Sequence, residues 1–330
     1  MSVSVSFNNV YIQSCSSIGG PKEGKGPYGN YFDLIIDDHY NHQNTFEEGE
    51  VAMSSFSIKL ALKKARLKKE DVPLMIGGDL SNQIAISSLV MKEFSSSSIG
   101  VYSACSTFSL SLGLASIFVE NGISDYALSF TSSSFPVAER QFRYPNNYGI
   151  QKKETTTSTV TGAASFIVGN RKTKIKVSEL TLGRVHDPDS YDLNDLGSPM
   201  AFAAFHTIKD HLANFHSSIE DYDLIFTGDL SKIGSSVLYD CFKLENINLE
   251  NHLDAGEIVY YREEEKMYAG GSGPSCIAIM SAGYVIKEMI KGTYKKVLLV
   301  ATGALFSSTT SYQKKTIPVI AHAITLEVVK

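Results

Sequence analysis

The chain has 330 residues, of which 43% are hydrophobic and 20% charged, and it carries a formal net charge of −5. This length and composition are typical of a soluble protein with a sizeable core, built as two domains or as one large α/β unit. The negative balance argues against a nucleic-acid partner, because the one basic cluster, residues 63–69, closes an amphipathic helix rather than forming a stripe.

The cysteines and the apolar segments exclude further classes of protein. Four cysteines lie far apart with no CxxC pair, which fits neither a zinc site nor a dense disulfide framework and suits a reducing compartment. Residues 1–7 alternate like a strand and lack the basic start and apolar run of a signal peptide. The longest apolar run, residues 275–286, is far shorter than the roughly 20 residues that a membrane span needs. Any membrane association is therefore expected to be peripheral.

Strands and helices are predicted to alternate along the chain, as in proteins whose mainly parallel sheets are covered on both faces. Apolar periodicity and turn residues define the expected elements. In chain order they are strand 1–7, helix 56–65, strand 71–79, a helix from 104, strand 126–130, strand 163–168, helix 201–212, strand 221–229, a helix from 273 and strand 296–301.

Two stretches of the chain are similar to each other. Residues 71–81 (DVPLMIGGDLS) and 221–231 (DYDLIFTGDLS) agree at six of eleven positions, and each predicts a buried strand that ends in a Gly-Asp turn. The same order of turn, helix and strand then follows in both places. The repeat predicts two duplicated halves, residues 1–170 and 171–330, with a site where strand ends and helix starts of both halves meet.

Cys105 lies between small residues at the start of a predicted helix, where a nucleophile would be placed. With the internal duplication, this resembles the thiolase superfamily, in which a His and a second His or Asn from the second half assist the cysteine. Here Thr227 and Gly228 stand at the expected His position, and Gly271 at the expected Asn position. The resemblance therefore implies the fold, which is α/β and thiolase-like, with mainly parallel five-stranded sheets in an α-β-α-β-α arrangement, but not a condensing activity.

A set of short motifs gives a more specific resemblance. They are 20–27 (GPKEGKGP), 78–83 (GDLSNQ), 104–107 (ACST), 138–145 (AERQFRYP), 157–162 (TSTVTG), 228–231 (GDLS), 269–273 (AGGSG), 301–305 (ATGAL) and 316–322 (TIPVIAH). Together they resemble the stage V sporulation protein AD family of endospore formers, over residues 18–325.

The resemblance implies a non-catalytic protein that binds dipicolinic acid (pyridine-2,6-dicarboxylate) and takes part in its uptake, with calcium, into the developing spore. It implies membrane-embedded partner proteins from the same operon, a homodimer, and a cytoplasmic chain that associates peripherally with the spore inner membrane. We expect no cofactor and no metal site of the protein's own, with calcium entering only as the counter-ion of the ligand.

For Cys105 and its neighbour Ser106, three interpretations remain: covalent catalysis, a pocket wall whose backbone N–H groups hold an anion, or packing. We favour the pocket wall. Arg140 and Arg143 could bind two carboxylates, with Tyr144 against the ring, or the segment could pair at a dimer interface; both interpretations stay open.

Asp79 and Asp229, the repeated acids, could face one cavity and orient ligands or calcium, but helix capping is the favoured interpretation. Gln83 is a candidate pocket amide. Gly271 and Ser272, in the glycine-rich turn, could allow a ligand to approach the backbone closely. For His322, which ends the last of the motifs, we favour a structural role with satisfied hydrogen bonds.

Overall fold

The computed structural model of the protein describes residues 2–142 and 153–329. Its strands form two groups of five that repeat one order. In the first group the order is β5 (Ser97–Gly100), β4 (Leu74–Gly78), β6 (Tyr126–Ser133), β8 (Gly162–Gly169) and β2 (Tyr11–Gly19). In the second it is β11 (His252–Asp254), β10 (Leu224–Gly228), β13 (Lys296–Ala304), β14 (Val319–Val328) and β9 (Ile175–Leu182).

Each group mixes parallel and antiparallel pairs in the same way. In the first group, β4 is parallel to β5 and β6, while β8 is antiparallel to β6 and β2. In the second group, β10 is parallel to β11 and β13, while β14 is antiparallel to β13 and β9. Four of the five strands thus run in one direction, as the prediction of mainly parallel sheets requires. The groups touch through an antiparallel bridge between Tyr11 and Lys176, so the ten strands form one continuous order. The division into domains at residues 170/171, between β8 and β9, stays a prediction.

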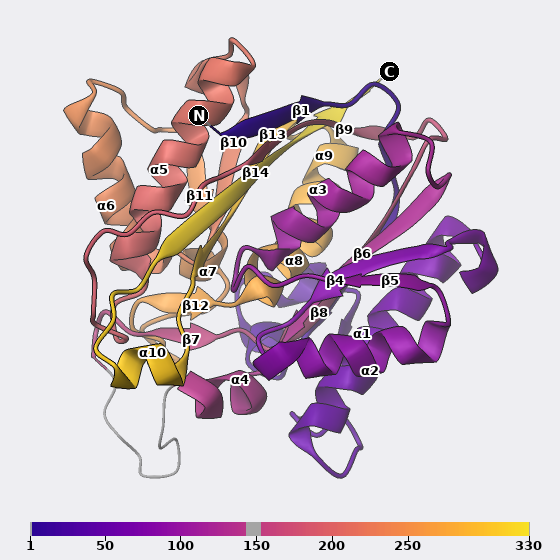
Figure 1. The fold of residues 1–330 in the computed structure, drawn as a ribbon, viewed down its shortest axis with the longest axis horizontal. Coiled ribbons are helices and arrows are strands. Elements are labelled where there is room, and N and C mark those ends of the chain that lie inside the picture. The colour runs from indigo at the N-terminus through magenta and orange to yellow at the C-terminus, as the bar shows by residue number, and fades with distance from the viewer. Residues whose placement is uncertain (1, 143–152, 330) are drawn as a thin grey trace.

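Helices form three layers around these strands (Figure 1). The outer layers are α1 (Phe46–Ala65) with α2 (Ala85–Phe94) on the first group, and α5 (Gly197–Asn214) with α6 (Ser231–Leu244) on the second. The middle layer is α3 (Thr107–Glu120) and α8 (Pro274–Met280), which lie side by side and contact strands of both groups. The predicted α-β-α-β-α arrangement is therefore present.

Burial explains why these helices take these places. Every residue of α8 is buried, and the faces of α3 that carry Phe108 and Leu112 share one large apolar core with Ile277 and Met280 of α8. A helix that is apolar all round is stable only when it is covered on all sides, as between two sheets. In contrast, α1 and α5 each bury one face in smaller cores and expose the other.

Helix α8 continues through a π-helical turn, η7 (Ser281–Val285), into α9 (Ile286–Lys291). The remaining elements that matter here are short. They are β1 (Val3–Ser6), β3 (Leu34–Ile35), α4 (Phe135–Phe142), β7 (Thr157–Thr159), α7 (Ala255–Ile258), β12 (Gly270–Ser272) and α10 (Ser308–Tyr312). No helix in residues 2–142 and 153–329 combines the length and the apolar character that crossing a bilayer requires.

Candidate functional site

A cavity of about 420 Å³ lies where the two halves meet, at the ends of β4 and β13. The first half contributes the loop 80–84, the turn 102–105 before α3, Gln141 of α4 and Thr159 of β7. The second half contributes Leu196 and Met200, Ser272 of β12, and the segment 304–308 that enters α10. This volume is within the usual range for a small-molecule site, and its place agrees with the prediction from the repeat. We call it the central cavity.

The lining of the central cavity is more apolar than polar and carries no charged side chain in the part of the chain that the structure describes. Hydroxyl and amide groups alternate there with apolar side chains such as Leu80, Ile84 and Phe306. Tyr102 is half accessible through the cavity, yet burial and then the neighbouring Cys105 raise its pKa to about 12, so its phenol stays neutral. The wall can therefore donate hydrogen bonds from several directions.

Asp79 holds the loop 80–84 in place from behind the cavity wall. Its fully buried carboxylate accepts hydrogen bonds from the backbone N–H and the hydroxyl of Ser81, and from those of Ser87 at 2.7 and 2.6 Å. Asp79 does not line the cavity, so among the two interpretations the structure favours capping over ligand contact. The loop it fixes carries Gln83, which does line the cavity.

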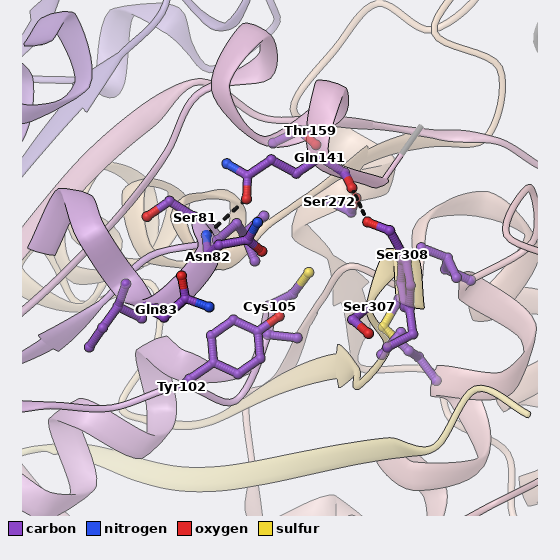
Figure 2. Close-up of a pocket in the computed structure, with 17 residues that line it drawn as sticks. Ser81, Asn82, Gln83, Tyr102, Cys105, Gln141, Thr159, Ser272, Ser307 and Ser308 are labelled. Carbon is purple, nitrogen blue, oxygen red and sulfur yellow. Dashed lines mark hydrogen bonds between the residues drawn. The ribbon is translucent and has the colours of Figure 1, made fainter. Parts of the chain in front are cut away.

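The backbone around the cavity is strained at three non-glycine residues. Gln83, Ile84 and Ala104 have φ values of 57°, 48° and 48°, in the left-handed region. Such conformations cost free energy and cluster at functional sites, where the surrounding structure imposes them. Here they turn the Gln83 amide and Cys105, which follows Ala104, toward the cavity (Figure 2).

Gln141 links the two halves across the mouth of the cavity. The Asn82 backbone N–H donates to Gln141 Oε1 at 2.8 Å, and the Ser308 hydroxyl donates to the Gln141 carbonyl oxygen at 2.7 Å. Figure 2 shows both bonds above the Cys105 sulfur, which points into the enclosed space. Asn82, Gln141, Ser307 and Ser308 were missed by the sequence analysis, which weighed the charged neighbours of Gln141 and not its amide.

The turn that carries Cys105 is braced from the protein interior. Ser106 is fully buried behind the wall, and its hydroxyl donates to the Ser103 carbonyl oxygen at 2.6 Å. The Ser103 hydroxyl lies 3.1 Å from His322 Nε2, while the Gly183 N–H donates to His322 Nδ1 at 3.2 Å. Burial lowers the pKa of His322 to about 4, so the imidazole is neutral. His322 is thus a structural histidine, as the sequence analysis favoured, and Ser106 supports the wall without lining it.

Gly228 and Gly271, which the sequence analysis expected at the acid–base positions of thiolases, have no room for a side chain. A Cβ on Gly228 would lie 2.5 Å from Ile277 Cβ, and a Cβ on Gly271 would lie 2.6 Å from Val160 Cγ2. The Thr227 hydroxyl donates to Asp254 Oδ2 at 2.6 Å and lies 2.8 Å from His252 Nε2, in a buried cluster outside the cavity lining. Neither glycine could be replaced by His or Asn without moving the core.

Asp229, the second repeated acid, is also buried outside the cavity lining. It accepts a hydrogen bond from the Gly273 N–H through Oδ1. Burial and then the charge of Asp254 raise the pKa of Asp229 well above its usual range. Asp229 and Asp79 therefore do not face one cavity, as the functional alternative required. Among residues 2–142 and 153–329, no group of three or more His, Cys, Asp or Glu side chains is placed to hold a metal ion.

The structure does not place the described part of the arginine-rich segment against the cavity as expected for ligand binding. Arg140 is not among the lining residues, and its guanidinium pairs with Glu47 of α1 on the surface. Its neighbour Glu139 is buried and accepts hydrogen bonds from the N–H and hydroxyl of Thr159, at 2.9 and 3.0 Å. Arg143 and Tyr144 lie outside the described residues. Among the other expected site residues, three line the cavity, namely Gln83, Cys105 and Ser272. Gly271 does not line the cavity and directly precedes Ser272 in the sequence.

Comparison with known proteins identifies relatives along nearly the whole chain. Residues 2–327 match the family described as Stage V sporulation protein AD. The protein of that name from Bacillus subtilis (strain 168) is 37% identical over 318 residues, covering 96% of this chain and 94% of its own length.

Solved structures of similar fold are much more distant in sequence. A variant of OleA from Xanthomonas campestris superposes with a TM-score of 0.62 at 15% identity, covering 98% of this chain and 99% of that one. The 3-oxoacyl-[acyl-carrier-protein] synthase III from Aquifex aeolicus VF5 gives a TM-score of 0.57 at 14% identity, covering 99% and 100%. These likenesses confirm the predicted thiolase-like fold and carry no statement about activity.

Proposed function

The chain belongs to the stage V sporulation protein AD family, and on that premise we propose that it is a non-catalytic binding protein for dipicolinic acid that takes part in its uptake into the developing spore. The observation that carries the proposal is the central cavity. It keeps a ligand-sized space beside Cys105, while positions 228 and 271, which would supply acid–base groups, are closed to side chains.

The lining suits a flat ring that bears hydrogen-bond acceptors. Leu80, Ile84 and Phe306 offer apolar faces to the ring, and the amide of Gln83 with the hydroxyl of Ser307 can donate to carboxylate oxygens. Hydrogen bonds to a charged group are worth about 1.5–3 kcal/mol each. Several of them could hold a dicarboxylate, with calcium as the counter-ion that offsets its charge.

Isothermal titration with dipicolinate, with and without calcium, tests the proposal. We expect a single site, weaker binding of isophthalate, which lacks the ring nitrogen, and retained binding in Cys105→Ser. Gln141→Ala, which unlinks Asn82 from Ser308, should weaken binding about tenfold. The matched control is Gln43→Ala, an exposed glutamine far from the cavity in sequence. If neither dipicolinate nor its calcium chelate produces heat at millimolar concentration, the proposal fails.

A second candidate is acyl transfer through Cys105, favoured by its place on the cavity wall ahead of α3, where a helix N-terminus stabilises a thiolate. A general base is needed as well, and the described lining contains no His, Asp, Glu or Lys. Mass spectrometry after incubation with acyl-CoA donors distinguishes the two functions. An acyl adduct that is absent from Cys105→Ser would establish the enzyme; labelling by iodoacetamide alone would eliminate it.

A third alternative is a scaffold of a transport complex whose cavity has lost its ligand. We propose in addition that the chain forms a homodimer and docks on membrane-embedded proteins of the same sporulation operon, at the spore inner membrane. Co-purification of the Gln141→Ala variant with these proteins separates the roles: lost ligand binding with retained assembly would count against a pure scaffold.

A further inference from the structure

A second pocket, of about 330 Å³, lies at the seam where the first strands of the two halves meet. Strands β2 and β9 touch there through Tyr11 and Lys176, and η7 and α9 close one side. We call it the seam pocket. In Figure 1, α9 lies toward the top of the molecule, whereas α4 and α10, which border the central cavity, lie near the bottom. The two spaces share no lining residue.

Three lysines from three different elements line the seam pocket. Lys64 comes from the end of α1, Lys174 from the segment that leads into β9, and Lys287 from α9. Their ion pairs among the described residues are both to Asp33, which lies 2.6 Å from Lys64 Nζ and 3.8 Å from Lys287 Nζ. Three ammonium groups against one carboxylate leave a surplus of two positive charges, on a chain whose net charge is −5.

These ammonium groups are held by backbone oxygens of the pocket wall and its surroundings. Lys64 Nζ donates to the Cys15 carbonyl oxygen at 3.0 Å, and Lys174 Nζ donates to that of Ile290; both acceptor residues line the pocket. Lys287 Nζ donates to the Tyr31 carbonyl oxygen. An ammonium group has three N–H donors, so the recorded acceptors leave donors on Lys174 and Lys287 for a ligand. These hydrogen bonds hold the lysines in place, and their surplus positive charge and remaining N–H donors are available to a ligand.

The floor of the pocket is apolar and includes an irregular helical turn. Ile12, Ile175 and Ile286 are buried and line it, and Ala282 belongs to the π-helical turn η7. π-turns within α-helices occur frequently at functional sites, because the extra residue widens the helix and re-aims its carbonyls. Here the Ala282 carbonyl accepts from the Cys15 thiol at 3.7 Å. The floor therefore offers apolar contact beneath the charged rim.

We propose that the seam pocket is a second ligand site, which binds an organic anion with an apolar body, such as a medium-chain carboxylate. The apolar part packs on the isoleucine floor, and the acidic group receives N–H bonds from Lys174 and Lys287. An acidic group on an apolar body occurs both in a free acid and in an anionic lipid. A free acid binds without a bilayer, whereas a lipid is presented by one. The site is independent of the central cavity and of its proposed ligand.

Titration calorimetry with octanoate on the full chain tests the proposal. Octanoate should bind at one site and acetate should not, because each buried methylene contributes about fourfold in affinity. Raising the salt concentration should weaken binding. In the double variant Lys174→Gln/Lys287→Gln the affinity should fall about tenfold. The matched control is Lys209→Gln, an exposed, ion-paired lysine on α5, which should bind octanoate like the unmodified chain.

Sedimentation with vesicles distinguishes the two sources of the anion. Binding to phosphatidylglycerol vesicles but not to phosphatidylcholine vesicles, lost in the double variant, assigns a lipid-borne anion. Octanoate binding without vesicle binding assigns a free acid. If neither probe binds, or if the double variant binds as tightly as the control, the proposal is overturned. Thermal unfolding of each variant shows whether it is folded, and dipicolinate titration of the same variants reports separately on the central cavity.

Discussion

The two halves share a Gly-Asp sequence at equivalent places in the repeat, but the two halves differ in which buried acid accepts most of the hydrogen bonds there. In the first half Asp79 accepts four hydrogen bonds, while its neighbour Glu50 accepts one, from the Ser132 hydroxyl at 2.8 Å. Burial and then the charge of Asp79 raise the pKa of Glu50 to about 8. In each half one buried acid accepts several hydrogen bonds, and the pKa of the other is raised.

In the second half the saturated acid is not the one in the Gly-Asp turn. Asp254 accepts from the Thr227 hydroxyl and from three backbone N–H groups, those of Leu230, Ser231 and Glu257. Burial raises its pKa to about 6, and its charge, after burial, helps to raise the pKa of Asp229. Two acids buried close together cannot both be charged at low cost, which is the physical reason for the raised pKa in each half. The two turns therefore share a Gly-Asp sequence but not a backbone conformation, since Asp229 and Ser231 are left-handed and Asp79 and Ser81 are not, and a different residue accepts most of the hydrogen bonds in each.

The largest expected effect is that of removing the saturated acid of the first half. Asp79→Ala leaves the N–H groups of Ser81 and Ser87 buried without an acceptor, and unsatisfied donors of this kind cost about 1–3 kcal/mol each. We expect a loss of about 3–5 kcal/mol in the free energy of unfolding, measured in urea, and a disordered loop 80–84. Asp240→Ala, on an exposed face of α6, is the control. A loss below 1 kcal/mol would show that Asp79 does not organise this turn.

Replacing Glu50, the protonated neighbour of Asp79, is expected to raise the free energy of unfolding rather than lower it. The pKa of Glu50 is higher in the folded state than in the unfolded chain, so the folded state binds the additional proton. Stability from this group is fully present below about pH 4.5 and is lost as the pH rises through about 8. Glu50→Gln, which keeps an acceptor for Ser132, should therefore gain up to about 3 kcal/mol at pH 7 and almost nothing at pH 4.

Urea unfolding of Glu50→Gln and the unmodified chain between pH 4 and 9 measures this difference. The two stability curves should converge at low pH and separate steadily toward pH 8. Parallel curves would mean that Glu50 is ionised in the folded protein, and the assignment of roles within the first half would then be wrong.

The sequence was sufficient to predict the fold because the two Gly-Asp turns follow buried strands at equivalent places in the repeat. It placed Cys105 and Gln83 at the cavity for the same reason, since both follow strand ends. It could not identify Gln141 or Ser308, because amides and hydroxyls carry no spacing signal and these two residues meet across 167 positions of the chain. Nor could it assign the roles of Asp79 and Asp229, because the repeated motif is identical while the donors differ: Asp79 accepts from nearby Ser81 and Ser87, and Asp229 from Gly273, 44 positions away.

The smallest loss of stability is expected for replacing Asp229, the acid in the second Gly-Asp turn. This variant tests the comparison between the two halves most directly, because Asp229 and Asp79 occupy equivalent places in the repeat. Asp229 accepts one hydrogen bond among the described residues, from the Gly273 N–H, so at pH 5 Asp229→Ala should cost about 1–2 kcal/mol, less than Asp79→Ala. Its left-handed backbone, with φ at 76°, adds to the cost in Ala, and Asp229→Gly separates that contribution. The cost should shrink as the pH rises above about 3.8, the ordinary pKa of the group, because the raised pKa in the folded state makes the carboxyl increasingly destabilising from there upward. Urea unfolding at pH 5 measures both variants. Equal losses in the free energy of unfolding for Asp79→Ala and Asp229→Ala would show that the two turns carry the same charge.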